Sequence, residues 1–258
     1  MTGWGASCCN KKTNGYWTAE EKTFHINQLE MLAAFFALKL FAKNLVNTQI
    51  LLRIDNSTAI SCINRMGSIQ YPHLNKISRN IWEFCEERKL YVFASYIKSS
   101  DNVIADFESR KIQSDTEWEL ASFAFREIIE RFGIPDIDLF ASRSNAKCEK
   151  YVSWKPDPFA FCVDAFTIDW NQYFFYAFPP FSMLLKTINK IRNEKSVGII
   201  VVPYWPTQPW YPLFKKLTVS DIIYFKPSSD LLLSNDSRTH NLHQSITLAE
   251  AILSGKHY

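Results

Sequence analysis

The sequence predicts an α/β protein with two domains, and three observations support this prediction. The chain has 258 residues, which is enough for two domains of ordinary size. Hydrophobic residues make up 47% and charged residues 21% of the chain, a composition typical of a globular fold. Short apolar stretches alternate with longer helical ones in both halves. Because residues 111–116 are polar and interrupt this pattern, we expect domains over 1–112 and 118–258.

The first half is expected to form a mixed sheet with helices. Residues 4–9 read as a strand, 10–15 as a turn and 16–18 as a second strand. The elements expected next are a helix over 23–44, a strand over 49–54, a helix opening after Asp55, a helix over 72–87, a strand over 90–97, and a helix capped by Asp101 or Asn102 that runs toward Arg110.

The second half is expected to be a separate α/β domain. A helix over 117–132 should end at Gly133 and Pro135. Beyond it, short buried strands are expected at 137–141, 173–177 and 197–202, with a helix over 183–192. Strands separated by helices predict βαβ units and a mainly parallel sheet.

Composition narrows the class of protein. The six cysteines include no C-x-x-C pair, which favours a reduced, intracellular compartment, cytoplasmic or nuclear. The longest apolar run, 31–42, is interrupted by Lys39 and is too short to cross a bilayer, so no membrane partner is expected. A net charge of +3 permits a nucleic-acid partner without requiring one.

Three carboxylates lie at positions where they could bind a metal ion or another ligand. Glu30 is in a helix that is apolar on every side, where an ionised side chain is costly unless it is paired or bound to a metal. Asp55 ends a strand, at the edge where ligands gather in α/β folds. Asp106 is in the last helix of the first half. Taken singly, each also fits a plain role, as a solvent-facing residue, a helix cap or a helix-surface residue.

Four ordered strings in the first half carry a resemblance to a known family. They are GWGA at 3–6, HINQLE at 25–30, DNSTA at 55–59 and NVIAD at 102–106. In this order they resemble the ribonuclease H region of DIRS-type tyrosine-recombinase retrotransposons, over residues 1–112. The resemblance implies a module of a larger polyprotein, with a reverse transcriptase domain upstream, that hydrolyses RNA in RNA–DNA hybrids.

The resemblance also implies a catalytic mechanism and its ligands. Such enzymes hold two divalent cations, Mg²⁺ or Mn²⁺, between four carboxylates. Glu30, Asp55 and Asp106 would be three of these ligands and catalytic residues. In the family the fourth is an Asp a few residues before GWGA, whereas this chain has no Asp or Glu before Glu20. We therefore expect an N-terminally truncated ribonuclease H-like sheet, weak metal binding and little hydrolysis.

The second half resembles phage Dam-type adenine methyltransferases over residues 118–226. The resemblance rests on strings that occur in the same order, namely DIDLFAS at 136–142, NAKC at 145–148, DAF at 164–166 and PPF at 179–181. It implies S-adenosylmethionine near Asp138, Ala141 and Asp164. It also implies that Pro179, Pro180 and Phe181 face a flipped adenine in DNA.

Two departures weaken the methyltransferase interpretation. The residue before Pro179 is Phe178, where the family has an Asp or Asn that accepts a hydrogen bond from the target amine. A glycine-rich cofactor loop is also missing. The leading hypothesis is therefore a retroelement-derived ribonuclease H module, impaired by the missing Asp. The alternatives are a non-catalytic nucleic-acid-binding remnant and an adenine methyltransferase.

Overall fold

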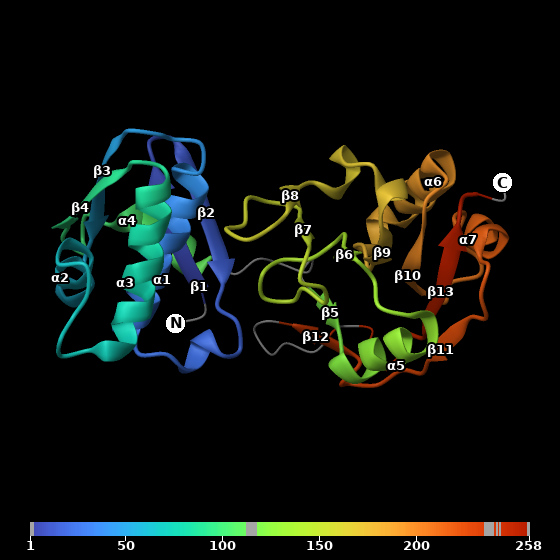
Figure 1. Cartoon of the computed structure of the whole chain (residues 1–258). Coiled ribbons are helices and arrows are strands. Elements are labelled where there is room, and N and C mark those ends of the chain that lie inside the picture. Colours follow the sequence, from blue (N-terminus) through green and yellow to red (C-terminus); the bar gives the residue numbers. More distant parts are fainter. Residues whose placement is uncertain (1–2, 112–117, 235–239, 241, 243, 257–258) are drawn as a thin grey trace. The chain divides into compact units, whose positions relative to one another are not determined.

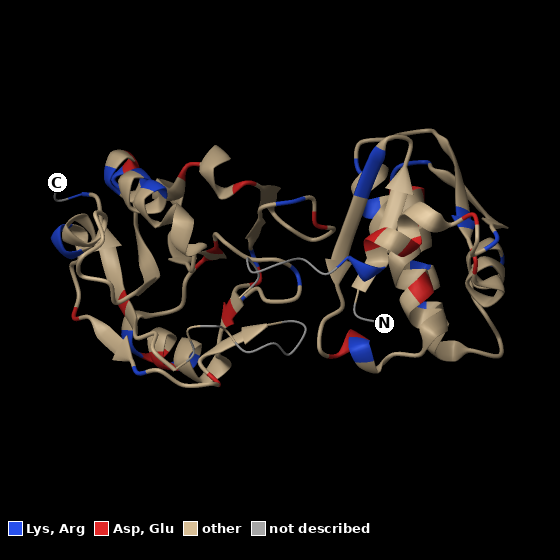
Figure 2. Cartoon of the chain, turned by 180° about the vertical axis from the view of Figure 1, so that it is seen from behind, with Lys and Arg blue, Asp and Glu red and all other residues tan. Residues whose placement is uncertain are grey.

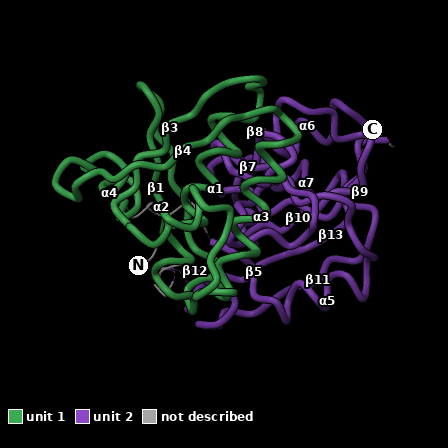
Figure 3. Tube along the Cα trace, turned by 60° about the vertical axis from the view of Figure 1, so that its left-hand side comes forward, with its two compact units in different colours: residues 1–112 green, residues 113–258 purple. Residues whose placement is uncertain are grey.

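The computed structural model describes residues 3–111, 118–234, 240, 242 and 244–256. The chain forms two compact units, Met1–Ile112 (unit 1) and Gln113–Tyr258 (unit 2) (Figures 1 and 3). Each unit combines helices with β-sheets, so the expected α/β class is confirmed. Most of the polar stretch at which we expected the boundary, 112–116, lies outside the described residues. Within the described part, no helix is both long and apolar enough to cross a membrane.

Unit 1 is built from four strands and four α-helices in its described part. They are β1 (Gly3–Cys8), β2 (Lys11–Tyr16), α1 (Ile26–Phe41), β3 (Gln49–Ile54), α2 (Ser57–Asn64), α3 (Pro72–Glu87), β4 (Tyr91–Tyr96) and α4 (Val103–Arg110). The first turn is shorter than expected, because Cys8 pairs with Lys11 and Cys9 takes up a left-handed φ of 53°. The second strand consequently begins at Lys11 and not at Tyr16.

The strands of unit 1 form two separate sheets where one mixed sheet was expected. β1 and β2 make an antiparallel hairpin, and β3 and β4 make a parallel pair. Among the described residues, no strand pairs with the second edge of β1 or of β3. One antiparallel pair and one parallel pair are the strand directions found in a mixed sheet. Among the described residues, however, no strand joins the β1–β2 pair to the β3–β4 pair.

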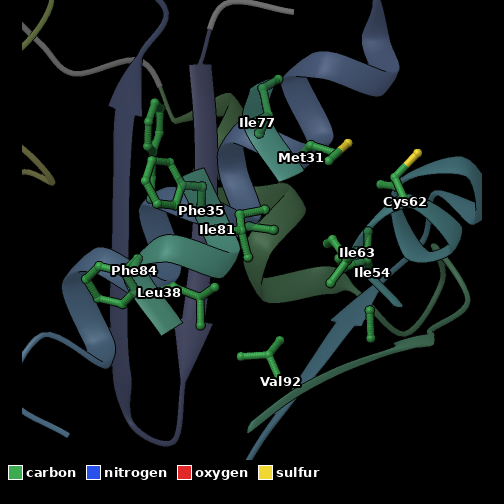
Figure 4. Packing of buried hydrophobic residues seen from close by; sticks show 14 of the residues in the cluster. Met31, Phe35, Leu38, Ile54, Cys62, Ile63, Ile77, Ile81, Phe84 and Val92 are labelled. Atoms are coloured by element: carbon green, nitrogen blue, oxygen red, sulfur yellow. The ribbon is translucent and has the colours of Figure 1, made fainter. Parts of the chain in front are cut away.

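A single core nevertheless unites unit 1. α1 lies against α3, and Phe35 meets Phe84 with ring centroids 6.3 Å apart (Figure 4). Ile54 of β3 and Val92 of β4 belong to the same cluster of buried side chains. Met31 is fully buried, as expected for a helix that is apolar on every side. This packing holds α1, α3, β3 and β4 together.

Unit 2 is richer in short strands. Its elements are β5 (Trp118–Leu120), α5 (Ser122–Phe132), β6 (Ile137–Asp138), β7 (Val152–Ser153), β8 (Cys162–Val163), β9 (Phe174–Ala177), α6 (Leu184–Glu194), β10 (Val197–Pro203), α7 (Tyr211–Leu217), β11 (Ile223–Phe225), β12 (Leu232–Ser234) and β13 (Leu248–Ser254). The expected helix over 117–132 begins only at Ser122, because residues Trp118–Leu120 pair with β12 as a strand. Tertiary pairing overrides local helical preference here.

The central sheet of unit 2 has the order β11-β13-β10-β9-β6. β6, β9 and β10 are parallel, whereas β13 and β11 add in antiparallel fashion. The expectation of a mainly parallel sheet is therefore correct only for its β6-β9-β10 half. Hydrophobic clusters cover both faces of this sheet. Lys and Arg are interspersed with Asp and Glu over both units (Figure 2).

Candidate functional site

Glu30 is placed by the start of α1. The helix begins after His25, whose Nδ1 accepts a hydrogen bond from the Asn27 amide at 3.2 Å. The Gln28 side chain accepts one in return from the His25 amide at 3.3 Å, which completes a capping box. Glu30 follows in the next turn, half-buried between buried neighbours.

Asp55 is held near Glu30 by a link between two asparagines. It directly follows β3, and the next residue, Asn56, caps α2 by accepting a hydrogen bond from the Ala59 amide at 2.9 Å. The Asn56 amide group donates to the Asn27 side-chain oxygen at 2.9 Å. Since Asn27 lies one turn before Glu30, this bond ties the end of β3 to the start of α1.

Asp106 comes from α4, which packs closely on β1. A Cβ added to Gly5 would lie 2.4 Å from both the Ala105 oxygen and the Ser109 amide nitrogen, so only glycine permits this contact. On the same helix, the buried Glu108 accepts a hydrogen bond from the Asn14 side chain at 2.5 Å. These contacts with the β1–β2 hairpin fix the position of α4.

The three carboxylates act on one another electrostatically. The pKa of Glu30 is raised to about 7, first by burial and then by the charges of Asp55 and Asp106. Among the described residues, none donates a hydrogen bond to the Glu30 carboxyl that would offset this repulsion. Functional sites often bring like charges together from separate parts of the chain and leave one carboxyl, here that of Glu30, without a hydrogen bond from the described residues.

As placed, the carboxylates do not form a metal cage. Within the described residues, no three His, Cys, Asp or Glu side chains are grouped so as to hold a metal ion. Asp106 instead pairs with Arg110 at 2.8 Å, and the Ser99 hydroxyl donates to Asp55 at 3.1 Å. Oxygen ligands of the kind that Mg²⁺ prefers are present, but a metal ion would require Asp106 to leave Arg110 and a further ligand to join the three.

A large cavity lies between α2 and α3 in unit 1. It has a volume of about 1160 Å³ and is lined by residues of α2, α3 and the loop that joins them. Ser57 and Thr58, just after Asp55, are at one part of its wall, and Arg65 and Arg79 supply positive charge. No local sequence pattern indicates this cavity. None indicates the role of Asn27 either, since the pairing of two asparagines 29 positions apart leaves no local signal.

In unit 2, Asp138 ends β6 and Ala141 lies in the loop that follows, and both are buried. The Asp138 carboxylate accepts hydrogen bonds from the Phe140 amide at 3.2 Å and the Lys147 amide at 3.0 Å. Burial raises the pKa of Asp138 to about 6, although these two hydrogen bonds act to lower it. The Ala141 amide donates to the Val152 oxygen at 3.1 Å. Asp138 thus satisfies its own loop and offers no accessible oxygen to a cofactor.

Asp164 has a similar local role at the surface. It adopts a left-handed φ of 65° and accepts a hydrogen bond from the Phe166 amide at 3.0 Å, which starts a short 3₁₀ helix. The expected S-adenosylmethionine ligands are therefore engaged by their own backbone. On these contacts, the residues present do not fit that cofactor.

The expected base-facing string lies in an aromatic cluster after β9. Pro179 is buried, and Pro180 precedes a short 3₁₀ helix that begins at Phe181. The Phe181 ring contacts those of Phe178, Trp205 and His240, with centroids 5.3–6.3 Å apart. These rings pack on one another, as expected for a hydrophobic core at the end of a strand.

Comparison with known proteins finds one group of relatives. The chain is 35% identical over 100 residues to the enzymatic polyprotein of cauliflower mosaic virus, in strains D/H and Strasbourg, and 34% identical to that of strain CM-1841. The similar stretch is 38% of this chain and spans only 14% of each viral polyprotein. No family model matches the chain. The similarity supports a relation between part of this chain and a viral enzymatic polyprotein.

Proposed function

We propose that unit 1 is a ribonuclease H-type module of a retroelement polyprotein, acting on the RNA strand of RNA–DNA hybrids. The observation that supports this most is the approach of Glu30, Asp55 and Asp106, which come from three elements far apart in sequence. The similarity to a viral enzymatic polyprotein agrees with such an origin. By the resemblance in sequence, the element is of DIRS type and its reverse transcriptase domain lies upstream.

The cavity between α2 and α3 supports a polyanionic substrate. Arg65 and Arg79 on its wall can neutralise backbone phosphates, although Glu83 and Glu86 also line it, and the Ser57 and Thr58 hydroxyls can donate to phosphate oxygens. These two residues follow Asp55 by two and three positions, so one part of the cavity wall is close in sequence to the proposed site of cleavage.

Hydrolysis in this chain alone is proposed to be weak. Mg²⁺ or Mn²⁺, when bound, would activate a water and stabilise the leaving oxygen. Glu30, Asp55 and Asp106 would supply three carboxylates to hold it, and Asp106 would first have to leave Arg110. By resemblance, the fourth ligand is an Asp preceding Gly3, and the sequence has no carboxylate before Glu20. The open edges of β1 and β3 are where a strand carrying it would pair.

The test is cleavage of a labelled RNA–DNA hybrid in Mg²⁺ by this chain and by a version extended at its N-terminus with a strand that carries Asp. We expect the extended version to cleave at least about 100-fold faster, since each tenfold in rate needs only about 1.4 kcal/mol of transition-state stabilisation. Matched controls are the same extension with Asn for Asp, and the extended version with Asp55→Asn; both should be inactive.

Two results would change the proposal. Efficient Mg²⁺-dependent cleavage by the unextended chain, abolished by Asp55→Asn, would show that three carboxylates suffice. Hybrid binding without cleavage in every version would leave the alternative, a non-catalytic nucleic-acid-binding remnant. We assign no methyl transfer to unit 2, because Asp138 and Asp164 are held by their own loops and Phe178 cannot accept a hydrogen bond from an amine.

A further inference from the structure

A short segment of unit 2 presents aromatic rings to solvent. Between and beside β7 and β8, Trp154 is 61% exposed, Phe159 43% and Phe161 48%. Such large apolar side chains are costly to leave in water, and their concentration within eight positions marks an interaction surface. We call Trp154, Phe159 and Phe161, together with the lysines described below, the aromatic–lysine surface.

The segment that carries these rings is held firmly in place. Asp157, at its centre, accepts hydrogen bonds from the Tyr151 hydroxyl at 2.6 Å, the Arg143 amide at 2.9 Å and the Phe159 amide at 3.1 Å. The Phe161 amide donates to the Tyr151 oxygen at 2.8 Å. A rigid display of rings lowers the entropy lost when a ligand binds to them.

Lysines lie directly on the exposed rings. The Lys155 ammonium is 5.4 Å from the Trp154 ring centroid, and that of Lys150 is 4.9 Å from the Phe161 ring and 5.0 Å from the Tyr173 ring. Within residues 150–161 the one carboxylate is Asp157, whose oxygens accept three hydrogen bonds, and Glu149 and Asp164 flank the segment. The segment offers two ring–lysine pairs, Trp154 with Lys155 and Phe161 with Lys150.

We propose that the aromatic–lysine surface binds single-stranded nucleic acid. Exposed bases would stack on Trp154 and Phe161, and Lys150 and Lys155 would neutralise the adjoining phosphates. Bases have flat faces that rings can stack on, and the backbone supplies the negative charge that complements the lysines. A peptide would match the rings but would need its own acidic groups to match the lysines. The proposal concerns unit 2 and does not depend on cleavage by unit 1.

The test is fluorescence anisotropy of a labelled oligothymidylate or oligouridylate of about 12 nucleotides with the full chain at low salt. Trp154→Ala and Phe161→Ala should each weaken binding about tenfold, as expected for the loss of one stacked base. Lys150→Gln with Lys155→Gln should reduce the dependence of affinity on salt. Binding should quench tryptophan emission in the original chain and quench it less in Trp154→Phe.

The matched control is Phe123→Ala on α5, whose ring is 47% exposed and has no lysine on it in the described structure. This variant should bind like the original chain, and affinity for an RNA–DNA hybrid should be unchanged in all of these variants. Three results would overturn the proposal: no oligonucleotide binding at low salt, equal loss in Phe123→Ala, or unchanged affinity in both Trp154→Ala and Phe161→Ala. Loss of hybrid cleavage alone would bear only on unit 1.

Discussion

Both units contain a carboxyl group whose pKa is raised, but the two groups have different surroundings. Glu30 in unit 1 is half-buried, has two other carboxylates nearby and receives no hydrogen bond from the described residues. Asp138 in unit 2 is buried more deeply, yet each of its oxygens accepts a backbone N–H. Burial is the largest cause of the shift in both cases.

This difference in hydrogen bonding distinguishes Glu30, a candidate site residue, from Asp138, a residue that stabilises local structure. Hydrogen bonds from Phe140 and Lys147 make Asp138 part of its loop, and removing it would leave two donors unpaired. Nothing comparable depends on Glu30, which the fold holds beside Asp55 and Asp106 at a cost in stability. A carboxylate that lowers the stability of the fold and accepts no hydrogen bond from its neighbours is a better functional candidate than one that accepts backbone hydrogen bonds.

The largest expected effect comes from Asp138→Asn and depends on pH. A carboxyl whose folded pKa is raised stabilises fully below its unfolded pKa, and this stabilisation is lost as pH rises through the folded pKa. For Asp138 the ordinary value is 3.8 and the folded value about 6. At about 1.36 kcal/mol per pKa unit, its contribution should fall by about 2.4 kcal/mol between pH 4 and pH 7, since pH 4 lies just above the unfolded pKa.

Urea unfolding of the original chain and of Asp138→Asn over that range measures this change. The variant lacks the titrating group and loses the hydrogen bond from Lys147. Relative to the original chain it should be most destabilised at pH 4, because there the original side chain is protonated and replacing it relieves no buried charge. The difference in unfolding free energy should shrink toward pH 7 without changing sign, because the bond from Lys147 is lost at every pH. A constant difference across the range would mean that Asp138 has an ordinary pKa and that the comparison drawn here is wrong.

A smaller effect of opposite sign is expected for Glu30→Gln at pH 8. At this pH the original side chain is mostly ionised, and replacement removes both the cost of burying a charge and the repulsion from Asp55 and Asp106. Allowing for solvent screening at a half-buried position, we expect the variant to be about 1–2 kcal/mol more stable. Hydrogen exchange confined to unit 1 peptides should slow accordingly.

The matched comparison for this variant is Asp138→Asn at the same pH, which removes a charge but also loses a hydrogen bond from Lys147. A decrease in stability on Glu30→Gln would show that Glu30 has a stabilising partner, and unit 1 would lose its distinguishing feature. The same sign in both variants, with similar size, would mean that the two carboxyl groups are alike.

Much of unit 1 could be predicted from sequence because its signals are local. Strand Gln49–Ile54 and helix Pro72–Glu87 have the expected bounds, and Asn56 caps α2 as its chemistry suggests. The resemblance assigned Glu30, Asp55 and Asp106 to one site, and in the structure the charges of Asp55 and Asp106 act on Glu30.

What the sequence did not predict depends on contacts between distant residues. β5 and β12 become strands only by pairing with each other, and β13 joins the sheet of unit 2 from the C-terminal part of the chain. The division of unit 1 into two sheets follows from which strands are present, not from the character of any one of them. Whether a carboxylate such as Asp138 serves its own loop or a ligand is likewise decided by backbone geometry.

The most direct test of the central claim, that Glu30, Asp55 and Asp106 converge, is the pKa of Glu30 measured by NMR titration of ¹³C-labelled glutamate carboxyls and assigned with Glu30→Gln. The account predicts a midpoint near 7 in the original chain, a lower value in Asp55→Asn and in Asp106→Asn, and no change in Asp138→Asn. A midpoint near the ordinary value of 4.5, or one that neither Asp55→Asn nor Asp106→Asn changes, would contradict it.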